Sequence, residues 1–125
     1  MKDIVSTDAA PAAVGAYSQA TTTDDLVFTA GQIPLTPEGD LLDGAAIDVQ
    51  TEQALENVEA VIEEAGAGMD DVLKVTVYLD DIGDFDAMND IYETFFDDEP
   101  PARSAVGVDA LPKGVGVEIE AVATK

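Results

Sequence analysis

The strongest constraint on the fold is a helical stripe of apolar residues between positions 48 and 65. Apolar side chains recur there every three or four positions, and most of the glutamates of the segment lie off this stripe. The pattern predicts an amphipathic helix with one buried face, ended by Gly66 and Gly68. The stripe consists of Ala54, Leu55, Val58, Val61, Ile62 and Ala65.

Segments of strand character lie on both sides of this helix. The predicted strand at residues 26–30 is β-branched and aromatic, and the last one alternates apolar and polar residues. A polar turn is expected at residues 21–25. The predicted strands span residues 14–20, 26–30, 72–79, 102–108 and 115–123.

A second amphipathic helix is predicted after Asp84 and closed by Pro100 and Pro101. Its buried stripe consists of Phe85, Met88, Ile91, Tyr92 and Phe95. The order of elements predicts one α+β domain over residues 1–125, with two helices packed on one face of a mixed sheet. The other face of the sheet then needs a cover, and oligomerisation is the simplest one.

Composition excludes several classes of chemistry. The chain has no Cys and no His, which removes thiolate nucleophiles, disulfides, imidazole bases and nearly every zinc or iron site. No P-loop, dinucleotide fingerprint or nucleophile elbow occurs, and residues 80–84 lack the spacing of a calcium loop. We therefore expect no cofactor and no metal.

The charge balance is extreme: 27 acidic residues stand against five basic ones, giving a formal net charge of −22. Such a charge disfavours nucleic acid and anionic membranes as partners. The acidic residues are scattered along the chain, which favours adaptation to a salty, halophilic cytoplasm over an acidic surface for a basic partner. No apolar run is long enough to span a bilayer and residues 1–8 lack an apolar signal core, so a cytoplasmic location is expected.

Basic residues are scarce enough to be informative. Arg103 is the only arginine, and its planar guanidinium suits a carboxylate ligand; the alternative is a structural salt bridge. Glu118 and Glu120 project from one face of the last predicted strand, roughly 7 Å apart, and could hold a water, although two acidic surface residues would look the same. Tyr17 could orient a substrate or lie in the core, and Gly31 could admit a ligand to the backbone or form a tight turn.

Several segments, in order and spacing, resemble the RidA (YjgF) family over essentially the whole chain. They are APAAVGAYSQ at 10–19, TAGQIP at 29–34, NDIYETFF at 89–96 and PARSAV at 101–106, followed by LPK at 111–113 and VEIEA at 117–121. No single segment would be sufficient, but the combination is highly specific.

The resemblance implies a chorismate-mutase-like α+β fold and a homotrimer with three clefts between subunits. It also implies hydrolysis of enamines of the 2-aminoacrylate type and imines of the 2-iminobutyrate type to 2-keto acids and ammonia. By the same resemblance, Arg103 binds the substrate carboxylate, Glu118 and the backbone carbonyl of Ala105 hold the attacking water, Tyr17 lines the cleft and Gly31 offers backbone contacts.

The chain departs from the usual family pattern at three positions. Ala30 stands where many members have Ser, Ala105 where many have Cys, and Ala16 where a proline is frequent. These departures bear on substrate preference more than on the reaction. The alternatives to a deaminase are a non-catalytic, small-carboxylate-binding or chaperone-like trimer, and a ribonuclease or translation inhibitor, whose binding to RNA the net charge disfavours.

Overall fold

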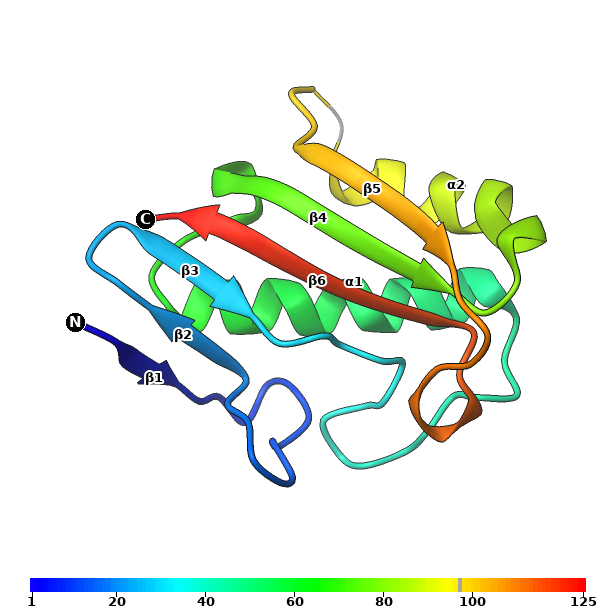
Figure 1. Ribbon diagram of the computed structural model, residues 1–125, viewed down its shortest axis with the longest axis horizontal. Helices are drawn as coiled ribbons and strands as arrows, with labels where there is room; N and C mark the ends of the chain where they lie inside the picture. Colours follow the sequence, from blue (N-terminus) through cyan, green and yellow to red (C-terminus); the bar gives the residue numbers. More distant parts are fainter. Residues whose placement is uncertain (97) are drawn as a thin grey trace.

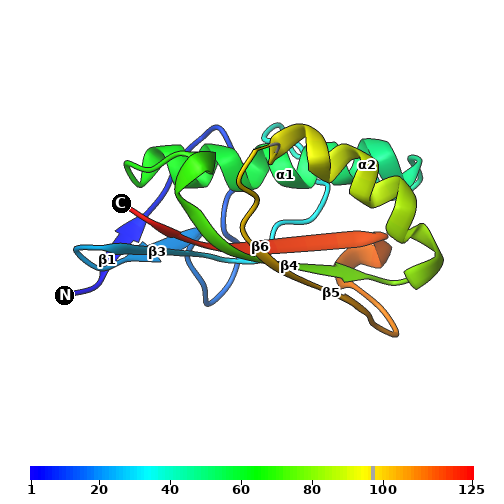
Figure 2. The same cartoon turned by 90° about the horizontal axis from the view of Figure 1, so that it is seen from above.

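The helix predicted near residue 50 is α1 (Ile47–Glu64), and its apolar stripe packs on a six-stranded sheet. Leu55, Val58 and Val61 on this stripe are fully buried. The second predicted helix is α2 (Phe85–Phe95), which lies beside α1 on the same face of the sheet (Figures 1 and 2). The computed structural model describes residues 1–96 and 98–125.

The strand order of the sheet is β1-β2-β3-β6-β4-β5. Strands β4 and β5 run parallel and are joined through α2, whereas the other neighbouring pairs are antiparallel. The strands are Asp3–Val5 (β1), Ala20–Thr22 (β2), Leu26–Thr29 (β3), Val72–Leu79 (β4), Ala102–Gly107 (β5) and Val117–Thr124 (β6). The mixed sheet with both helices on one face confirms the predicted α+β class.

Strand β6 shows how the two faces of the sheet differ. Val117, Ile119 and Ala121 are buried beneath the helices, while the alternating Glu118 and Glu120 are half-buried on the opposite face. No helix among the described residues covers that opposite face (Figure 2), which we call the open face. Phe28 and Val106 lie on it with 45% and 40% of their surfaces exposed.

The predicted strand at residues 14–20 is wrong. Only Ala20 of this segment is in a strand, β2 continues to Thr22 within the predicted turn, and residues 14–19 form a loop in which Gly15 adopts a φ of 104°. The side chain of Gln19 holds this loop: its Oε1 accepts a hydrogen bond from the backbone of Thr7, and its Nε2 donates to the backbone carbonyls of Thr7 and Pro11. Because the Gln19 side chain hydrogen-bonds the neighbouring backbone and so stabilises the loop, residues 14–19 do not extend the backbone hydrogen-bond ladder of β2.

Strand β1 was not predicted from the sequence. It is an edge strand of three residues in which only Val5 is buried, so no alternation is visible in the sequence. Three short 3-10 turns complete the structure: Met69–Asp71 (η1), Ile82–Asp84 (η2) and Pro112–Gly114 (η3). Within the described residues, neither helix combines the length and the apolar character that crossing a membrane requires.

Candidate functional site

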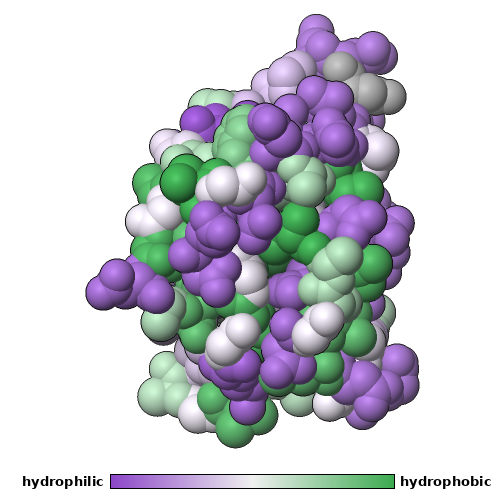
Figure 3. Space-filling view, turned by 90° about the vertical axis from the view of Figure 1, so that its right-hand side faces the viewer, coloured by the Kyte–Doolittle hydropathy of each residue, from purple (hydrophilic) through white to green (hydrophobic). Residues whose placement is uncertain are grey.

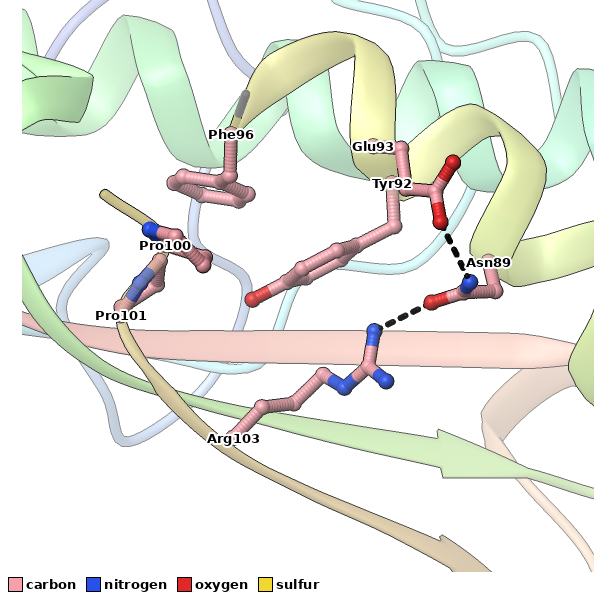
Figure 4. Close-up of a pocket in the computed structure, with 7 residues that line it drawn as sticks. All are labelled: Asn89, Tyr92, Glu93, Phe96, Pro100, Pro101 and Arg103. Carbon is pink, nitrogen blue, oxygen red and sulfur yellow. Dashed lines mark hydrogen bonds between the residues drawn. The ribbon is translucent and has the colours of Figure 1, made fainter. Parts of the chain in front are cut away.

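Arg103 lies on β5, opposite Val75 of β4, and its side chain points to the helix-covered side of the sheet. The centre of its guanidinium lies 4.6 Å from the ring centre of Tyr92 and 5.3 Å from that of Phe85, both on α2. Its Nη1 donates a 2.6 Å hydrogen bond to Oδ1 of Asn89 (Figure 4). The guanidinium is thus held by one helix through a hydrogen bond and two aromatic faces.

A cavity of about 640 Å³ opens beside this guanidinium, and we call it the arginine pocket. It is lined by Asn89, Tyr92, Glu93, Phe96, Pro100, Pro101 and Arg103 (Figure 4). Ala105 follows Arg103 two positions later on the same face and packs against the core. Because β5 is an edge strand, the outer side of its backbone can offer a carbonyl to a ligand.

Tyr92 forms a wall of the arginine pocket. The side chain is only 4% exposed, and its hydroxyl has no hydrogen-bond partner among the described residues. Burial raises the pKa of Tyr92 to about 12, an effect that the nearby Arg103 charge partly opposes. The phenol is therefore protonated at neutral pH, and it presents a neutral ring to the guanidinium.

Glu118 lies on β6, on the open face of the sheet, directly opposite Tyr78 of β4. Burial, and then the charge of Glu120 two residues further on, raise the pKa of the Glu118 carboxyl. The Tyr78 hydroxyl donates a 3.3 Å hydrogen bond to Oε1 of Glu120. A half-buried carboxylate with a raised pKa is a better base than a solvated one.

Gly31 approaches the Glu118 carboxylate so closely that a side chain at position 31 would fit only if the carboxylate moved. A Cβ placed on Gly31 would lie 2.6 Å from Oε2 of Glu118. The next residue, Gln32, pairs with Ile119 of β6 through two backbone hydrogen bonds of 2.7 and 3.0 Å, which brings the loop against the strand. Glycine at position 31 leaves space for the Glu118 carboxylate and exposes the backbone beside it.

Tyr17 lies on the same side of the molecule as this pair, with 54% of its surface exposed. Together they line a second cavity of about 370 Å³, the glutamate pocket. Its lining residues are Tyr17, Ala30, Gly31, Ile33, Pro112, Lys113 and Glu118. The structure therefore brings three of the predicted site residues, Tyr17, Gly31 and Glu118, into one pocket.

The arginine pocket and the glutamate pocket are not joined within this chain. Arg103 and Ala105 face the helices, Glu118 faces the opposite side, and strand β4 separates β5 from β6. The predicted site residues thus form two groups on the two faces of the sheet. Within the described part of the chain, no group of His, Cys, Asp or Glu side chains is arranged to hold a metal ion.

Reasoning from the sequence did not single out Asn89 or Lys113 as functional residues. Asn89 precedes Tyr92 by three positions and Glu93 by four, a spacing that places all three on neighbouring parts of one helix surface. This spacing could have indicated from the sequence that Asn89 lies beside Tyr92 and Glu93. Lys113 adopts a φ of 58°, unusual for a residue other than glycine, and nothing in the local sequence reveals its place at the glutamate pocket.

A comparison with protein families decides the identity of the fold. The family model described as Endoribonuclease L-PSP, which covers the RidA (YjgF) proteins, matches residues 7–125. The chain belongs to this family. The resemblance found in the sequence motifs is thereby confirmed.

Curated relatives of the RidA family cover nearly the whole chain. A RutC family protein of Pyrococcus abyssi is 48% identical, covering 99% of this chain and 98% of its own. The 2-iminobutanoate/2-iminopropanoate deaminase of Rattus norvegicus is 42% identical over 100% of this chain and 91% of its own, and the Capra hircus protein of the same name is 44% identical over 100% and 91%.

Solved structures agree with this assignment. E. coli TdcF with bound serine has a TM-score of 0.94 and 41% identity, covering 98% of each chain. RidA from an Antarctic Psychrobacter bacterium has a TM-score of 0.93 and 41% identity, covering 98% of this chain and 99% of its own. The six-stranded sheet with two helices is thus the RidA fold.

Proposed function

We propose that this protein is a hydrolytic deaminase that converts the imine tautomers of small enamino acids, such as 2-iminobutyrate, to 2-keto acids and ammonia. Two relatives at 42% and 44% identity carry the name of this activity. Other similar relatives carry only the name RutC family protein, so the proposal depends on the chemistry of the two pockets.

The substrate is a small carboxylate with an electrophilic imine carbon. Arg103 binds the carboxylate through its guanidinium, and the backbones at Gly31 and Ala105 and the ring of Tyr17 confine the rest of the molecule. The imine reacts in its protonated form, as an iminium ion. Water adds to the iminium carbon and passes a proton to the Glu118 carboxylate, and the nitrogen becomes a neutral amine. Glu118 then returns this proton to the nitrogen. The carbon–nitrogen bond breaks as the carbinol hydroxyl gives its proton back to Glu118, and the keto acid and ammonia leave.

This division of labour requires both pockets at one substrate, although they lie on opposite faces of the sheet. We propose that a homotrimer joins the arginine pocket of one copy to the glutamate pocket of its neighbour, giving three clefts. The exposed Phe28 and Val106 on the open face are consistent with burial against another copy. A cyclic trimer uses a heterologous interface, which is the arrangement that pairs two different surfaces.

A ribonuclease activity, which the family description suggests, fits this chain poorly. The net charge of −22 opposes binding of a polyanion, and the chain has no His. Hydrophilic and hydrophobic side chains are interspersed on the face shown in Figure 3. We propose instead that the acidic surface serves solubility in a cytoplasm of high salt.

The proposal is carried by one observation: the guanidinium of Arg103 borders an open cavity and is hydrogen-bonded to a neutral amide. The test is formation of 2-ketobutyrate from enzymatically generated 2-iminobutyrate in molar KCl, with semicarbazide as a competing trap. Wild type should outpace the trap, and Arg103→Ala should lower kcat/KM by about 100-fold or more.

Lys2→Ala is the matched control, because it also removes one positive charge but lies outside both pockets. It should retain full activity. A wild type that remains folded and binds small carboxylates without turnover would replace the deaminase with the binding protein considered above. Normal turnover by Arg103→Ala would remove Arg103 from the site.

A further inference from the structure

Among the described residues, the groups that hold the guanidinium of Arg103 carry no charge. In a chain with 27 acidic residues, its hydrogen-bond partner among residues 1–96 and 98–125 is the side-chain amide of Asn89, at 2.6 Å. Its other neighbours are the rings of Tyr92 and Phe85. Arg103 is therefore oriented without losing the positive charge that an anionic ligand needs.

The direction of the Asn89 amide is set by a second residue on the same helix. Nδ2 of Asn89 donates a 3.0 Å hydrogen bond to Oε1 of Glu93, one helical turn later (Figure 4). A carboxylate accepts but does not donate, so the nitrogen of the amide must face Glu93. The oxygen is then left to face Arg103, which is the only orientation in which Asn89 can accept its hydrogen bond.

A carboxylate at position 89 would have nearly the same shape and the opposite effect. An Asp there would form a charge-assisted pair with the guanidinium and would compete with an incoming carboxylate. It would also face the acceptor oxygen of Glu93 with another acceptor. The amide thus differs from its isosteric acid in two ways: it adds no charge beside the guanidinium, and it donates a hydrogen bond to Glu93.

We propose that Asn89 is a positioning residue that orients Arg103 for a carboxylate without itself neutralising the guanidinium, and that Glu93 sets the orientation of the Asn89 amide. The carboxylate belongs to the substrate, so this inference rests on the proposed function for its biological meaning. Its physical content, the affinity of Arg103 for a small carboxylate, is independent of turnover.

The test combines calorimetry of 2-ketobutyrate binding with KM and kcat for the imine, both on the assembled full-length protein in molar KCl. Asn89→Asp should weaken binding and raise KM by about 100-fold, and Asn89→Ala by about 10-fold, because the first introduces a competing charge and the second removes only one hydrogen bond. The value of kcat should change by less than about threefold in both.

Glu93 supplies the conservative comparison. Glu93→Gln can still accept through its amide oxygen and should bind 2-ketobutyrate like the wild type, whereas Glu93→Ala should weaken binding by about threefold to tenfold. Thr94→Asp adds one negative charge at an exposed position of the same helix, outside the arginine pocket, and should leave affinity unchanged.

The outcomes separate the two proposals. If wild type binds 2-ketobutyrate with this pattern of variants but does not hydrolyse the imine, the positioning role stands and the deaminase assignment fails. If wild type turns over but Asn89→Asp, shown to be folded by circular dichroism, keeps wild-type affinity and KM, the positioning role is overturned and the deaminase assignment stands. Equal losses in Asn89→Asp and Thr94→Asp would also overturn it.

Discussion

The two pockets differ in how much of their architecture one chain supplies. In the arginine pocket, α2 of the same chain provides the hydrogen bond and both aromatic faces that hold Arg103. The glutamate pocket lies on the open face, and Tyr17, which lines it, is 54% exposed. The helix-covered face therefore fixes Arg103, the proposed anion-binding group, on its own. The open face carries Glu118, the proposed base, beside the backbone of Gly31, and the proposed trimer would enclose this pocket with a second copy.

If each cleft joins Arg103 of one copy to Glu118 of its neighbour, two inactive variants should complement each other in a mixed trimer. Arg103→Ala and Glu118→Gln should each be nearly inactive alone. Refolding them together in equal amounts should restore about a quarter of wild-type activity, because in a random cyclic trimer one interface in four joins an intact Arg103 to an intact Glu118. Steady-state rates on the mixture measure this.

The control for the mixture is the double variant carrying both changes, co-refolded with wild type, which should give about the same quarter. A mixture of the single variants that stays inactive would mean that both groups act within one chain, contrary to the proposed cleft.

The next largest effect concerns the base on the open face. Glu118→Gln should lower kcat by about 100-fold or more with KM little changed, because it removes the proton acceptor and leaves Arg103 in place. In the wild type, the rate should fall on acidification through the raised pKa of Glu118, above the ordinary value of 4.5, since only the ionised carboxylate accepts the proton.

Glu120→Gln sharpens this test. Glu120 is the second cause of the raised Glu118 pKa, after burial, so its neutralisation should move the acid limb of the pH–rate profile to lower pH. If the acid limb of the pH–rate profile does not move in Glu120→Gln, a group other than Glu118 controls the loss of rate at low pH.

A substitution at Gly31 tests whether the close contact between its backbone and the Glu118 carboxylate matters for the reaction. Gly31→Ala should lower kcat by about 10-fold to 100-fold, because its Cβ would lie 2.6 Å from Oε2 of Glu118 and displace the carboxylate. The displaced atoms end a flexible side chain, so thermal stability should change little. Gly44→Ala is the matched control, since no atom lies within 4 Å of its added Cβ, and its activity should be that of the wild type.

Salt should affect the whole molecule more than either pocket. Raising KCl from about 0.1 M to about 1 M shortens the screening length from about 10 Å to about 3 Å, and we expect the Tm to rise by about 5 °C or more. The helix α1 illustrates the repulsion: burial, then Glu63 and Glu56, raise the pKa of Glu59. Equal unfolding temperatures at both salt concentrations would contradict the halophilic interpretation.

The raised pKa of Glu59 also determines how the stability of the folded chain changes with pH. The folded chain binds the Glu59 proton more tightly than the unfolded chain, so its contribution to stability falls as pH rises from 4.5 through the raised pKa. Thermal unfolding between neutral pH and pH 5 measures this. Glu59→Gln should flatten the dependence.

The smallest expected effect is on the helix-covered face. Tyr92→Phe keeps the ring beneath Arg103 and removes a buried hydroxyl without a partner among the described residues, so stability should stay the same or rise by up to about 1 kcal/mol. Binding of 2-ketobutyrate should be unchanged. Thermal unfolding checks it, and a loss of more than about 1 kcal/mol would show that the hydroxyl has a partner, such as a bound water.

The sequence predicted the elements whose periodicity is regular. The stripe of α1 and the alternation of β6 both report which side chains are buried, so the position of Glu118 on the face opposite the helices follows from the sequence pattern. Strand β5 carries no such signal, because its burial does not alternate, and the side of the sheet on which Arg103 lies was therefore not predictable. The split of the site between two faces follows from that one strand.

Other features depended on contacts distant in the sequence. The loop before β2 is held by the side chain of Gln19 reaching back to Thr7 and Pro11, which no periodicity reveals. The scarcity of arginine identified Arg103 as a candidate, but it gave no indication that Asn89, fourteen positions away, would hold it.

The position of β6 in the sheet has a consequence for biosynthesis. It lies between β3 and β4, which have no strand contact with each other, although both precede it in the chain. While the polypeptide emerges from the ribosome, these two strands and both helices are made before the strand that unites them. The nascent chain must keep a half-formed core from aggregating until residues 117–124 arrive, and its high density of negative charge provides repulsion between neighbouring nascent chains during that interval.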